Sequence, residues 1–295
     1  MSFSSEVKET LSKITNLADK EAVKYELLGY LISQNTTYYK KHVQYRAENE
    51  YTINRFSKLL SNCGTTDFAI SMKGKSYIID FSYNMYFREL QIIGDNLEIT
   101  DKLEKETALQ SEKNDKAFIR GVFLGSGSVN HPEKKYHLEI TLSTANNAEF
   151  IQKILQKIGI PMKRLFKKNG VTLYLKEGEE ISAFLAFIGA SQAVLKFEEI
   201  RVLRQMKNKI NRKVNCETAN LSKTIEASVK QIEAIEKLQK NGRFETLPIN
   251  LKEIALLRLE NPDASLIQLG EMLNNPIGKS GVNHRLKSLI ELAEE

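Results

Sequence analysis

The sequence predicts an α+β protein with a duplicated α-β-β-α-β-β-α domain and a separate all-α domain at its C-terminal end. Three observations support this prediction: one order of helices and strands recurs, a basic run follows it, and three short helices come last. With 295 residues, of which 41% are hydrophobic and 27% charged, the chain can bury the cores of two domains. We expect the duplicated domain at residues 1–206, a basic linker region at 207–222 and the all-α domain at 223–295.

The duplicated domain consists of two copies, at about residues 21–96 and 114–200. Periodicity in the first copy predicts helix 22–34, strand 42–48, helix 51–62, strands near 67–72 and 76–82, and helix 84–93. At an offset of 92–96 residues the second copy repeats this order, with helix 115–126, strand 136–143, helix 146–158, strands near 163–167 and 171–176, and helix 178–189. The charged segment Asp101–Lys116 lacks apolar periodicity and is expected to connect the copies.

Individual side chains repeat as well. Leu59, Leu60 and Gly64 correspond to Ile154, Leu155 and Gly159, while Gly29 and Ser33 correspond to Gly121 and Gly125. Residues four apart share one helix face, so the first helix of each copy presents two small residues over which another backbone can approach closely. We therefore expect these two helices to pack on each other. The alternative is a coincidence between two ordinary amphipathic helices.

The net charge of +6 comes from the middle of the chain. Residues 107–220 carry 19 basic and 11 acidic groups, whereas residues 1–106 carry 14 and 15, and residues 221–295 carry 10 and 11. A local excess of this kind attracts a polyanion such as a nucleic acid. A solvated basic face is the alternative interpretation.

Cysteine usage and hydropathy predict a cytoplasmic protein without a membrane segment, and the nucleoid association that we also expect depends on the DNA binding predicted below. Cys63 and Cys216 are the only cysteines and lie far apart in the sequence, so neither a disulfide framework nor a zinc site is indicated. The N-terminus lacks the apolar run of a signal peptide, and no later run approaches the roughly 20 apolar residues of a membrane span.

The densest positive run of the chain spans residues 201–213 and contains no acidic residue. Phosphate contacts need cations but little geometric precision, so this run is suited to holding a nucleic-acid backbone. Val202, Met206 and Ile210 recur every four residues and predict a helix with one buried stripe. The expected phosphate contacts are Arg201, Arg204, Lys207, Lys209, Arg212, Lys213 and, further along the chain, Lys279.

The C-terminal segment is expected to form a small helical bundle. After the sequence NCETAN, a stripe of Ile225, Val229, Ile232 and Ile235 predicts a helix that Asn241 and Gly242 should end. Next come a helix over 250–260 closed by Asn261-Pro262, a helix over 266–273 with a capping box of Ser265 and Gln268, and a last helix capped by Ser280. Three short helices of this kind are typical of a helix-turn-helix, although the turn is two residues longer than usual.

The last helix would then lie in the major groove of DNA, with Gly270 allowing the second helix to approach it. Arg285 can bind guanine and Asn283 adenine with two hydrogen bonds each. The residues expected to read bases are Ser280, Gly281, Asn283, His284, Arg285, Lys287 and Ser288. A trihelical module that binds proteins is the alternative.

The duplicated domain, with its second motif FIRGVFLGSGSVN from Phe118 to Asn130, resembles the LAGLIDADG homing endonuclease fold. In those nucleases each packed helix ends in a carboxylate, and the pair holds the divalent metals that activate water. In this sequence Gln34 and Ser126 occupy the acid positions, and neither carries a charge. The resemblance therefore implies a DNA-binding fold with no catalytic residues, no metal and no cofactor.

Basic residues near the predicted strands could contribute to a saddle over DNA, as the same resemblance implies. They are Lys134, Lys135, Lys163, Arg164, Lys167 and Lys168. Such residues can equally protect a sheet edge against aggregation. Asp115, His131 and Glu133 are the remaining candidates for a metal site, and scattered polar residues of this kind are usually solvated.

Three segments together resemble the WhiA family of Gram-positive bacterial DNA-binding proteins: Phe118–Asn130, Lys196–Thr224 and Glu260–Leu286. This resemblance covers nearly the whole chain. It implies a degenerate LAGLIDADG-like domain tethered to a helix-turn-helix, and roles in cell division, chromosome segregation and, in spore-forming actinobacteria, sporulation.

We therefore expect a sequence-specific regulator that binds double-stranded DNA without cutting it. A partner transcription factor is compatible with this role, and the sequence leaves the oligomeric state open. Two other classes remain alternatives: a metal-dependent LAGLIDADG-type endonuclease and a protein-interaction scaffold. Nicking of DNA with a divalent cation would indicate the first, and DNA affinity that does not depend on salt would indicate the second.

Overall fold

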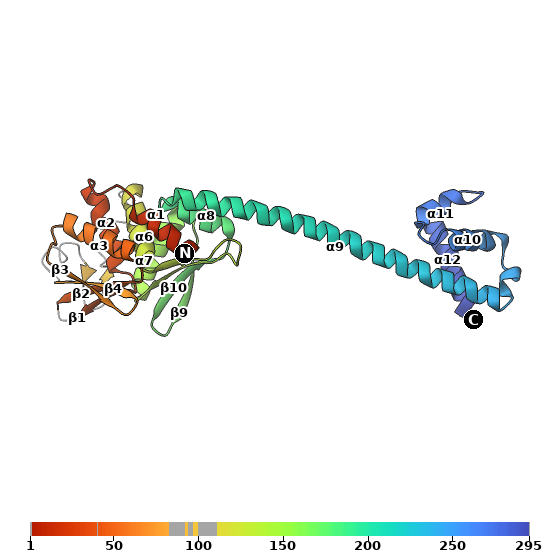
Figure 1. Cartoon of the computed structure of the whole chain (residues 1–295), viewed down its shortest axis with the longest axis horizontal. Coiled ribbons are helices and arrows are strands. Elements are labelled where there is room, and N and C mark those ends of the chain that lie inside the picture. The colour runs from red at the N-terminus through yellow and green to blue at the C-terminus, as the bar shows by residue number, and fades with distance from the viewer. Residues whose placement is uncertain (1, 40, 83–91, 94–96, 100–110, 295) are drawn as a thin grey trace. The chain divides into compact units, whose positions relative to one another are not determined.

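The computed structural model describes residues 2–39, 41–82, 92–93, 97–99 and 111–294 (Figure 1). The chain divides into two compact units, Met1–Gln205 and Met206–Glu295. Within the described residues, no helix combines the length and apolar character needed to cross a bilayer.

The first unit contains the predicted duplication. Its first copy comprises α2 (Lys20–Leu31), β1 (Thr36–Tyr39), β2 (His42–Ala47), α3 (Glu50–Asn62), β3 (Phe68–Lys73) and β4 (Ser76–Ser82). Its second copy comprises α6 (Glu112–Ser126), β7 (Gly127–Val129), β8 (Leu138–Leu142), α7 (Ala145–Lys157), β9 (Lys163–Lys167), β10 (Gly170–Leu175) and α8 (Gly178–Phe187). The predicted α+β fold class, with a duplicated domain of helices and strands and a separate helical domain, is confirmed.

The two sheets of this unit have the same topology. Their strand orders are β1-β2-β4-β3 and β7-β8-β10-β9, and all neighbouring strands are antiparallel. Helix α3 packs on β2 and β4, and α7 packs on β8 and β10. Alternate residues of β2 and β8 are buried, as expected for strands that carry a core on one face.

Helices α2 and α6 pack on each other through the small residues predicted from the repeat. A Cβ atom added to Gly121 would lie closer than 3.0 Å to the carbonyl oxygen of Glu26, and one added to Gly29 would lie as close to the backbone of Phe118. A Cβ at Gly125 would meet the side chain of Ser33. Any larger residue would push the helices apart, so this prediction is confirmed.

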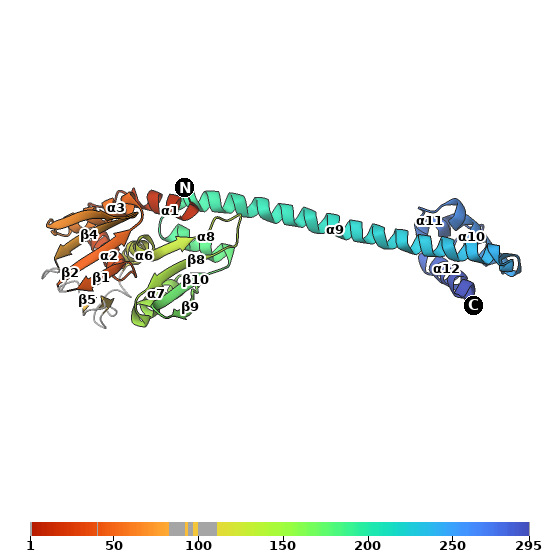
Figure 2. The ribbon, with the colours of Figure 1, turned by 60° about the horizontal axis from the view of Figure 1, so that its bottom comes forward.

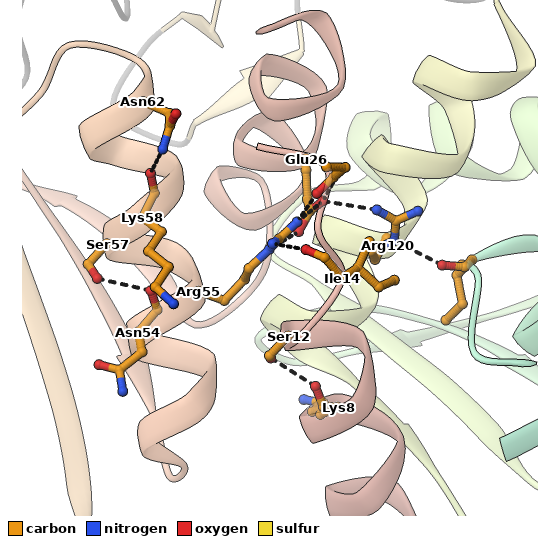
Figure 3. Close-up of polar contacts among 12 residues, drawn as sticks. Lys8, Ser12, Ile14, Glu26, Asn54, Arg55, Ser57, Lys58, Asn62 and Arg120 are labelled. Atoms are coloured by element: carbon orange, nitrogen blue, oxygen red, sulfur yellow. Dashed lines mark hydrogen bonds and ion pairs between the residues drawn. The ribbon is translucent and has the colours of Figure 1, made fainter. Parts of the chain in front are cut away.

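A buried carboxylate, Glu26, lies between two arginines at the same helix pair (Figure 3). Arg55 of α3 donates from Nε to Glu26 Oε1 at 2.7 Å and from Nη2 to Oε2 at 2.9 Å. Arg120 of α6 donates from Nη1 to Glu26 Oε2 at 3.1 Å and from Nε to the Ile188 carbonyl at 2.9 Å. Because Glu26 is fully buried, both arginines are needed to offset the cost of removing its charge from water.

Several elements of the first unit differ from the predictions. Helix α1 (Phe3–Ser12) was missed, although Ser2 caps it and Phe3, Val7 and Leu11 bury one face. Strands β1 and β7 were not predicted, because they are only four and three residues long. The helix expected over 84–93 lies outside the described residues except for Ile92 and Ile93, which form β5 and pair with β6 (Glu98–Ile99). Most of the expected connector 101–116 also lies outside them, and α6 already begins at Glu112.

Helix α9 (Ser191–Lys240) is one continuous helix of 50 residues, where the sequence suggested two helices separated by NCETAN. That stretch contains neither Pro nor Gly, so nothing in it breaks a helix. The expected burial of Val202, Met206 and Ile210 was wrong, because these side chains are 49%, 58% and 59% exposed. The spacing of four residues correctly indicated a helix, but this face of the helix is not packed in a core.

The second unit packs the C-terminal part of α9 against four short elements, as Figure 2 also shows. These are the 3-10 helix Arg243–Thr246 and the helices α10 (Ile249–Glu260), α11 (Leu266–Met272) and α12 (Lys279–Glu294). Their common core contains Ile235, Leu238, Phe244, Ile254, Leu269, Leu273, Val282, Leu286 and Leu289. The predicted end of α9 is confirmed, because Gly242 adopts a left-handed φ of 70° just after it.

Candidate nucleic-acid interface

The candidate interface is built on α11, α12 and the turn between them. Ser265 accepts from the Gln268 amide at 3.3 Å while Gln268 Oε1 accepts from the Ser265 amide at 2.8 Å, which confirms the predicted capping box. A Cβ atom on Gly270 would lie closer than 3.0 Å to the Ile277 carbonyl oxygen and 3.1 Å from Val282 of α12. Gly270 therefore lets α11 approach both the turn and α12, as the sequence predicted.

One face of α12 is free of the core. Val282, Leu286 and Leu289 are fully buried, whereas Lys279 and Asn283 are exposed. The remaining exposed residues of this face are Ser280, His284 and Lys287, and Lys287 lies 3.5 Å from Glu291 in an exposed ion pair. Because residues four apart share a helix face, Lys279, Asn283 and Lys287 form one polar line along α12.

A groove of about 260 Å³ runs beside this polar line. It is lined by Lys279 and Asn283 of α12, Lys223 of α9, and the beginning of α11 with its cap residue, Ser265 to Ile267. The groove thus brings together two ammonium groups, an amide and the beginning of a helix, each of which can contact the oxygens or base edges of a nucleic acid.

Arg258 holds the segment that leads into α11. Its guanidinium is buried and donates from Nη1 to the carbonyls of Ala264 at 2.7 Å and Pro262 at 3.3 Å. Ser228 of α9 donates to the same Pro262 carbonyl at 2.6 Å. Burial lowers the pKa of Arg258 below its usual value, and the carbonyls partly replace the water that the guanidinium has lost.

The other predicted base readers lie elsewhere on α12. Arg285 is half-buried and donates from Nη1 to the Asn250 carbonyl of α10 at 3.4 Å, on the flank of α12 away from Asn283. Gly281 faces the side chain of Ile277, and Ser288 is half-buried. The expected capping role of Ser280 was wrong, because α12 begins one residue earlier, at Lys279.

The predicted phosphate contacts of α9 fall into two groups. Arg201 lies 3.2 Å from Glu179 and 2.8 Å from Glu198, and the hydrogen bond to Glu198 is the largest cause of its raised pKa. Arg204 donates to the carbonyls of Pro132 and Lys134 and covers the ring of Tyr136 at 4.9 Å. Both arginines therefore anchor α9 to the first unit.

The second group is exposed and belongs to the second unit: Lys207, Lys209, Arg212 and Lys213. Lys213 lies 3.9 Å from Glu217 of the next turn, a distance at which an exposed pair is weak. This group presents its positive charge to solvent.

The two acid positions of the LAGLIDADG-like fold carry no charge. Gln34 donates from Nε2 to the Asn169 carbonyl at 3.2 Å, and Ser126 is the last residue of α6. His131 Nδ1 lies 3.7 Å from Glu133 Oε2, but Asp115 is not with them, and the described residues contain no group of three or more possible metal ligands.

The basic residues of the second sheet are divided between solvent and packing. Lys163, Lys167 and Lys168 are exposed on or beside β9, and Lys134 and Lys135 are exposed in the loop between β7 and β8. Arg164 is bound to Gln152 Oε1 at 2.8 Å. Leu165 and Phe166 are exposed among these cations, so this strand edge is both basic and apolar.

The sequence did not single out Lys223, Arg258 or the beginning of α11 as part of the interface. Lys223 lies two residues before Ile225, at the beginning of the predicted helical stripe, and has no local signal of its own. The capping box did mark the beginning of α11, and helix N-termini commonly bind phosphates. That signal could have been used.

Comparisons with known proteins agree with both units. The family model for the WhiA LAGLIDADG-like domain matches residues 115–207, and that for the WhiA C-terminal HTH domain matches residues 210–293. The "Probable cell division protein WhiA" of Caldicellulosiruptor saccharolyticus is 39% identical over 313 residues, covering 100% of this chain and 95% of the relative. That of Desulfitobacterium hafniense is 40% identical over 310 residues, covering 100% and 96%.

A solved structure extends the match to the arrangement of the elements. The crystal structure of full-length DUF199/WhiA from Thermotoga maritima has a TM-score of 0.62 and 28% identity, covering 100% of this chain and 98% of that one. The chain therefore belongs to the WhiA family, with a LAGLIDADG-like domain and a C-terminal helix-turn-helix domain.

Proposed function

We propose that this protein binds double-stranded DNA in a sequence-specific manner and regulates transcription without cutting DNA. The observation that carries the proposal is the groove in which Lys279 and Asn283 of α12 lie beside Lys223 and the beginning of α11. A helix in the major groove needs exposed polar side chains for base edges and cations beside it for phosphates, and this groove offers both.

In this proposal α12 reads bases through Ser280, Asn283, His284 and Lys287. Asn283 is suited to adenine, to which an amide can make two hydrogen bonds. Arg285, Gly281 and Ser288 take part only where DNA reaches the flanks of the helix, and Arg285 would have to leave the Asn250 carbonyl to contact guanine. Phosphates are held by Lys207, Lys209, Arg212, Lys213, Lys223 and Lys279, six cations of the second unit.

The LAGLIDADG-like domain acts in this proposal as a binding or scaffolding domain. Mg²⁺ is bound in proteins by carboxylates, and the two acid positions, Gln34 and Ser126, offer only an amide and a hydroxyl. The exposed lysines along β9 are available for DNA or for a partner protein. Arg201 is paired with carboxylates and Arg204 is bound to backbone carbonyls, so in this proposal both hold α9 in place and neither is a direct phosphate contact.

The biological role is inferred from the relatives, which are named probable cell division proteins. We infer a cytoplasmic, nucleoid-associated regulator that acts in cell division and chromosome segregation, with a partner transcription factor as a further binding partner.

The test is a binding titration of the full chain against duplexes selected from random DNA, over a range of salt concentrations. Neutralising about six phosphates should lower the affinity roughly 10³-fold between about 50 and 200 mM salt. Affinity that does not respond to salt, or no duplex preferred over random DNA, would contradict the proposal. Lys223→Ala should weaken this binding, and Lys240→Ala is its charge-matched control. Lys240 lies 17 residues, or about 25 Å, further along the same helix.

A further inference from the structure

A cavity of about 270 Å³ lies beside the degenerate acid position of the second copy, within the first unit. Its wall is formed by Lys8 of α1, Tyr45 of β2, Thr52 in the first turn of α3 and Ser126 at the end of α6. This volume is just below the roughly 300–1,000 Å³ of pockets that hold drug-sized ligands, so the cavity suits a smaller compound and cannot enclose a nucleic-acid duplex.

Two hydroxyl groups of this wall have no hydrogen-bond partner among the described residues, Thr52 Oγ1 and Ser126 Oγ. Thr52 is only 2% exposed, and its hydroxyl does not bond back to the preceding backbone, as threonine commonly does in helices. Leaving a buried donor unsatisfied costs about 1–3 kcal/mol. Both hydroxyls can donate to an acceptor that enters the cavity.

Among its described residues the same wall has more positive than negative charges, because Lys8 and Arg46 line it together with a single acidic residue, Glu48. Lys8 makes no ion pair with a described residue, and its ammonium instead lies 5.9 Å from the centre of the Phe123 ring. Burial lowers the pKa of Lys8 to about 8, and only the charge of Glu48 opposes that shift. The N-terminus of α3, whose cap residue Asn49 makes no side-chain capping bond, opens into the cavity as well. Helix α3 has 13 residues, and the partial positive charge at its N-terminus favours a negatively charged ligand.

We propose that this cavity is a binding site for a small metabolite, which it holds by an anionic oxygen group, a phosphate or a carboxylate. Lys8 supplies the counter-charge, Thr52 and Ser126 donate hydrogen bonds to the anionic oxygens, and the α3 N-terminus adds its partial positive charge. The rest of the volume takes a polar body of a few carbon atoms. The site is independent of the proposed DNA-binding face and is tested by ligand binding alone.

The experiment is calorimetric titration of the full chain with inorganic phosphate, glycerol 3-phosphate and citrate, with glycerol as the uncharged control. We expect at least one anion, and not glycerol, to bind at millimolar concentration or below. Thr52→Val keeps the shape of the side chain and removes the hydroxyl, and it should weaken binding at least about tenfold. Lys8→Met should weaken it as much, whereas Lys13→Met, an exposed lysine on the same segment, should not.

A second readout reports on the cavity itself. Acetylation of Lys8 at limiting reagent near pH 8, followed by mass spectrometry of the peptides, should slow when the anion is bound. Failure of all three anions to bind would overturn the proposal, as would binding that survives both Thr52→Val and Lys8→Met. Protection of Lys8 by a DNA duplex but by none of the small anions would also overturn it, because the site would then hold a backbone phosphate.

Discussion

Arg120 on α6 donates to the carboxylate of Glu26 on α2 across 3.1 Å, and so joins the two copies of the duplicated domain through a buried charge. Arg55 completes the site from α3 (Figure 3). The pair lies beside Gly121, where a Cβ atom would collide with the backbone carbonyl of Glu26. Close packing and charge pairing therefore stabilise the same helix interface.

Glu26→Gln should destabilise the first unit by about 3–5 kcal/mol, because two buried guanidinium groups would lose their anion. Urea unfolding followed by a probe in the first unit measures this. Glu21→Gln is the matched control, since Glu21 is exposed on the same helix. An equal loss in the two variants would show that the buried pairing contributes nothing.

Gly121→Ala should cost about 1–3 kcal/mol or more, because its Cβ would meet the backbone carbonyl of Glu26, which cannot move aside alone. Gly125→Ala should cost less when Ser33 is changed to glycine in the same protein, since Ser33 is the group that its Cβ would meet. Thermal unfolding of the single and double variants compares the two. A Gly121→Ala protein as stable as the wild type would refute the close approach of α2 and α6.

Lys8 should make the stability depend on pH above neutrality. Its pKa is about 8 in the folded protein and 10.5 in the unfolded chain, so the unfolded chain holds more protons between these values. The free energy of unfolding should therefore rise with pH between about 8 and 10 in the wild type relative to Lys8→Met. Tyr30 and Tyr45, whose pKa values burial raises, affect both proteins alike. The prediction would be contradicted if the free energies of unfolding of the wild type and Lys8→Met differed by the same amount at every pH in this range.

Asn283→Ala should cost about 1–3 kcal/mol of DNA-binding free energy at one base position and leave affinity for random DNA nearly unchanged. Lys207→Ala should instead weaken binding to all sequences about equally and reduce the salt dependence. Selection of preferred duplexes with each variant measures both effects. Arg285→Ala tests the other flank of α12, where Arg285 donates to the Asn250 carbonyl. If this variant loses its preference for a guanine, base reading belongs to that flank.

The protein should not nick supercoiled DNA in the presence of Mg²⁺ or Mn²⁺, because an amide and a hydroxyl stand where two carboxylates would hold the metals. Agarose gels of plasmid incubated with the purified chain provide the measurement. Nicking that disappears in Gln34→Ala or Ser126→Ala would establish an endonuclease instead.

Much of the fold could be predicted because local patterns and the repeat agreed. The alternation of strand 42–48, the capping box at Ser265 and the glycines of α2 and α6 each follow from local chemistry, and the structure contains all three. Strands β1 and β7 are too short for a periodic pattern, and α1 was overlooked although Ser2 and its apolar spacing marked it. The predicted burial of one stripe of α9 was wrong for Val202, Met206 and Ile210. Helical periodicity shows which residues share a face, but not whether another segment packs on that face.

The sequence by itself determined the family, the duplication, the small residues between α2 and α6, and the neutral residues at the two acid positions. Only the tertiary structure decided which cations are free: Arg201 and Arg204 are bound within the first unit, Arg285 rests on the Asn250 carbonyl, and Lys279, Asn283 and Lys223 share a groove. It also brought Lys8, Thr52 and Ser126 to one cavity. The physical reason is that charge and helix periodicity are local properties of the chain, whereas the solvent exposure and partners of a side chain depend on segments far away in sequence.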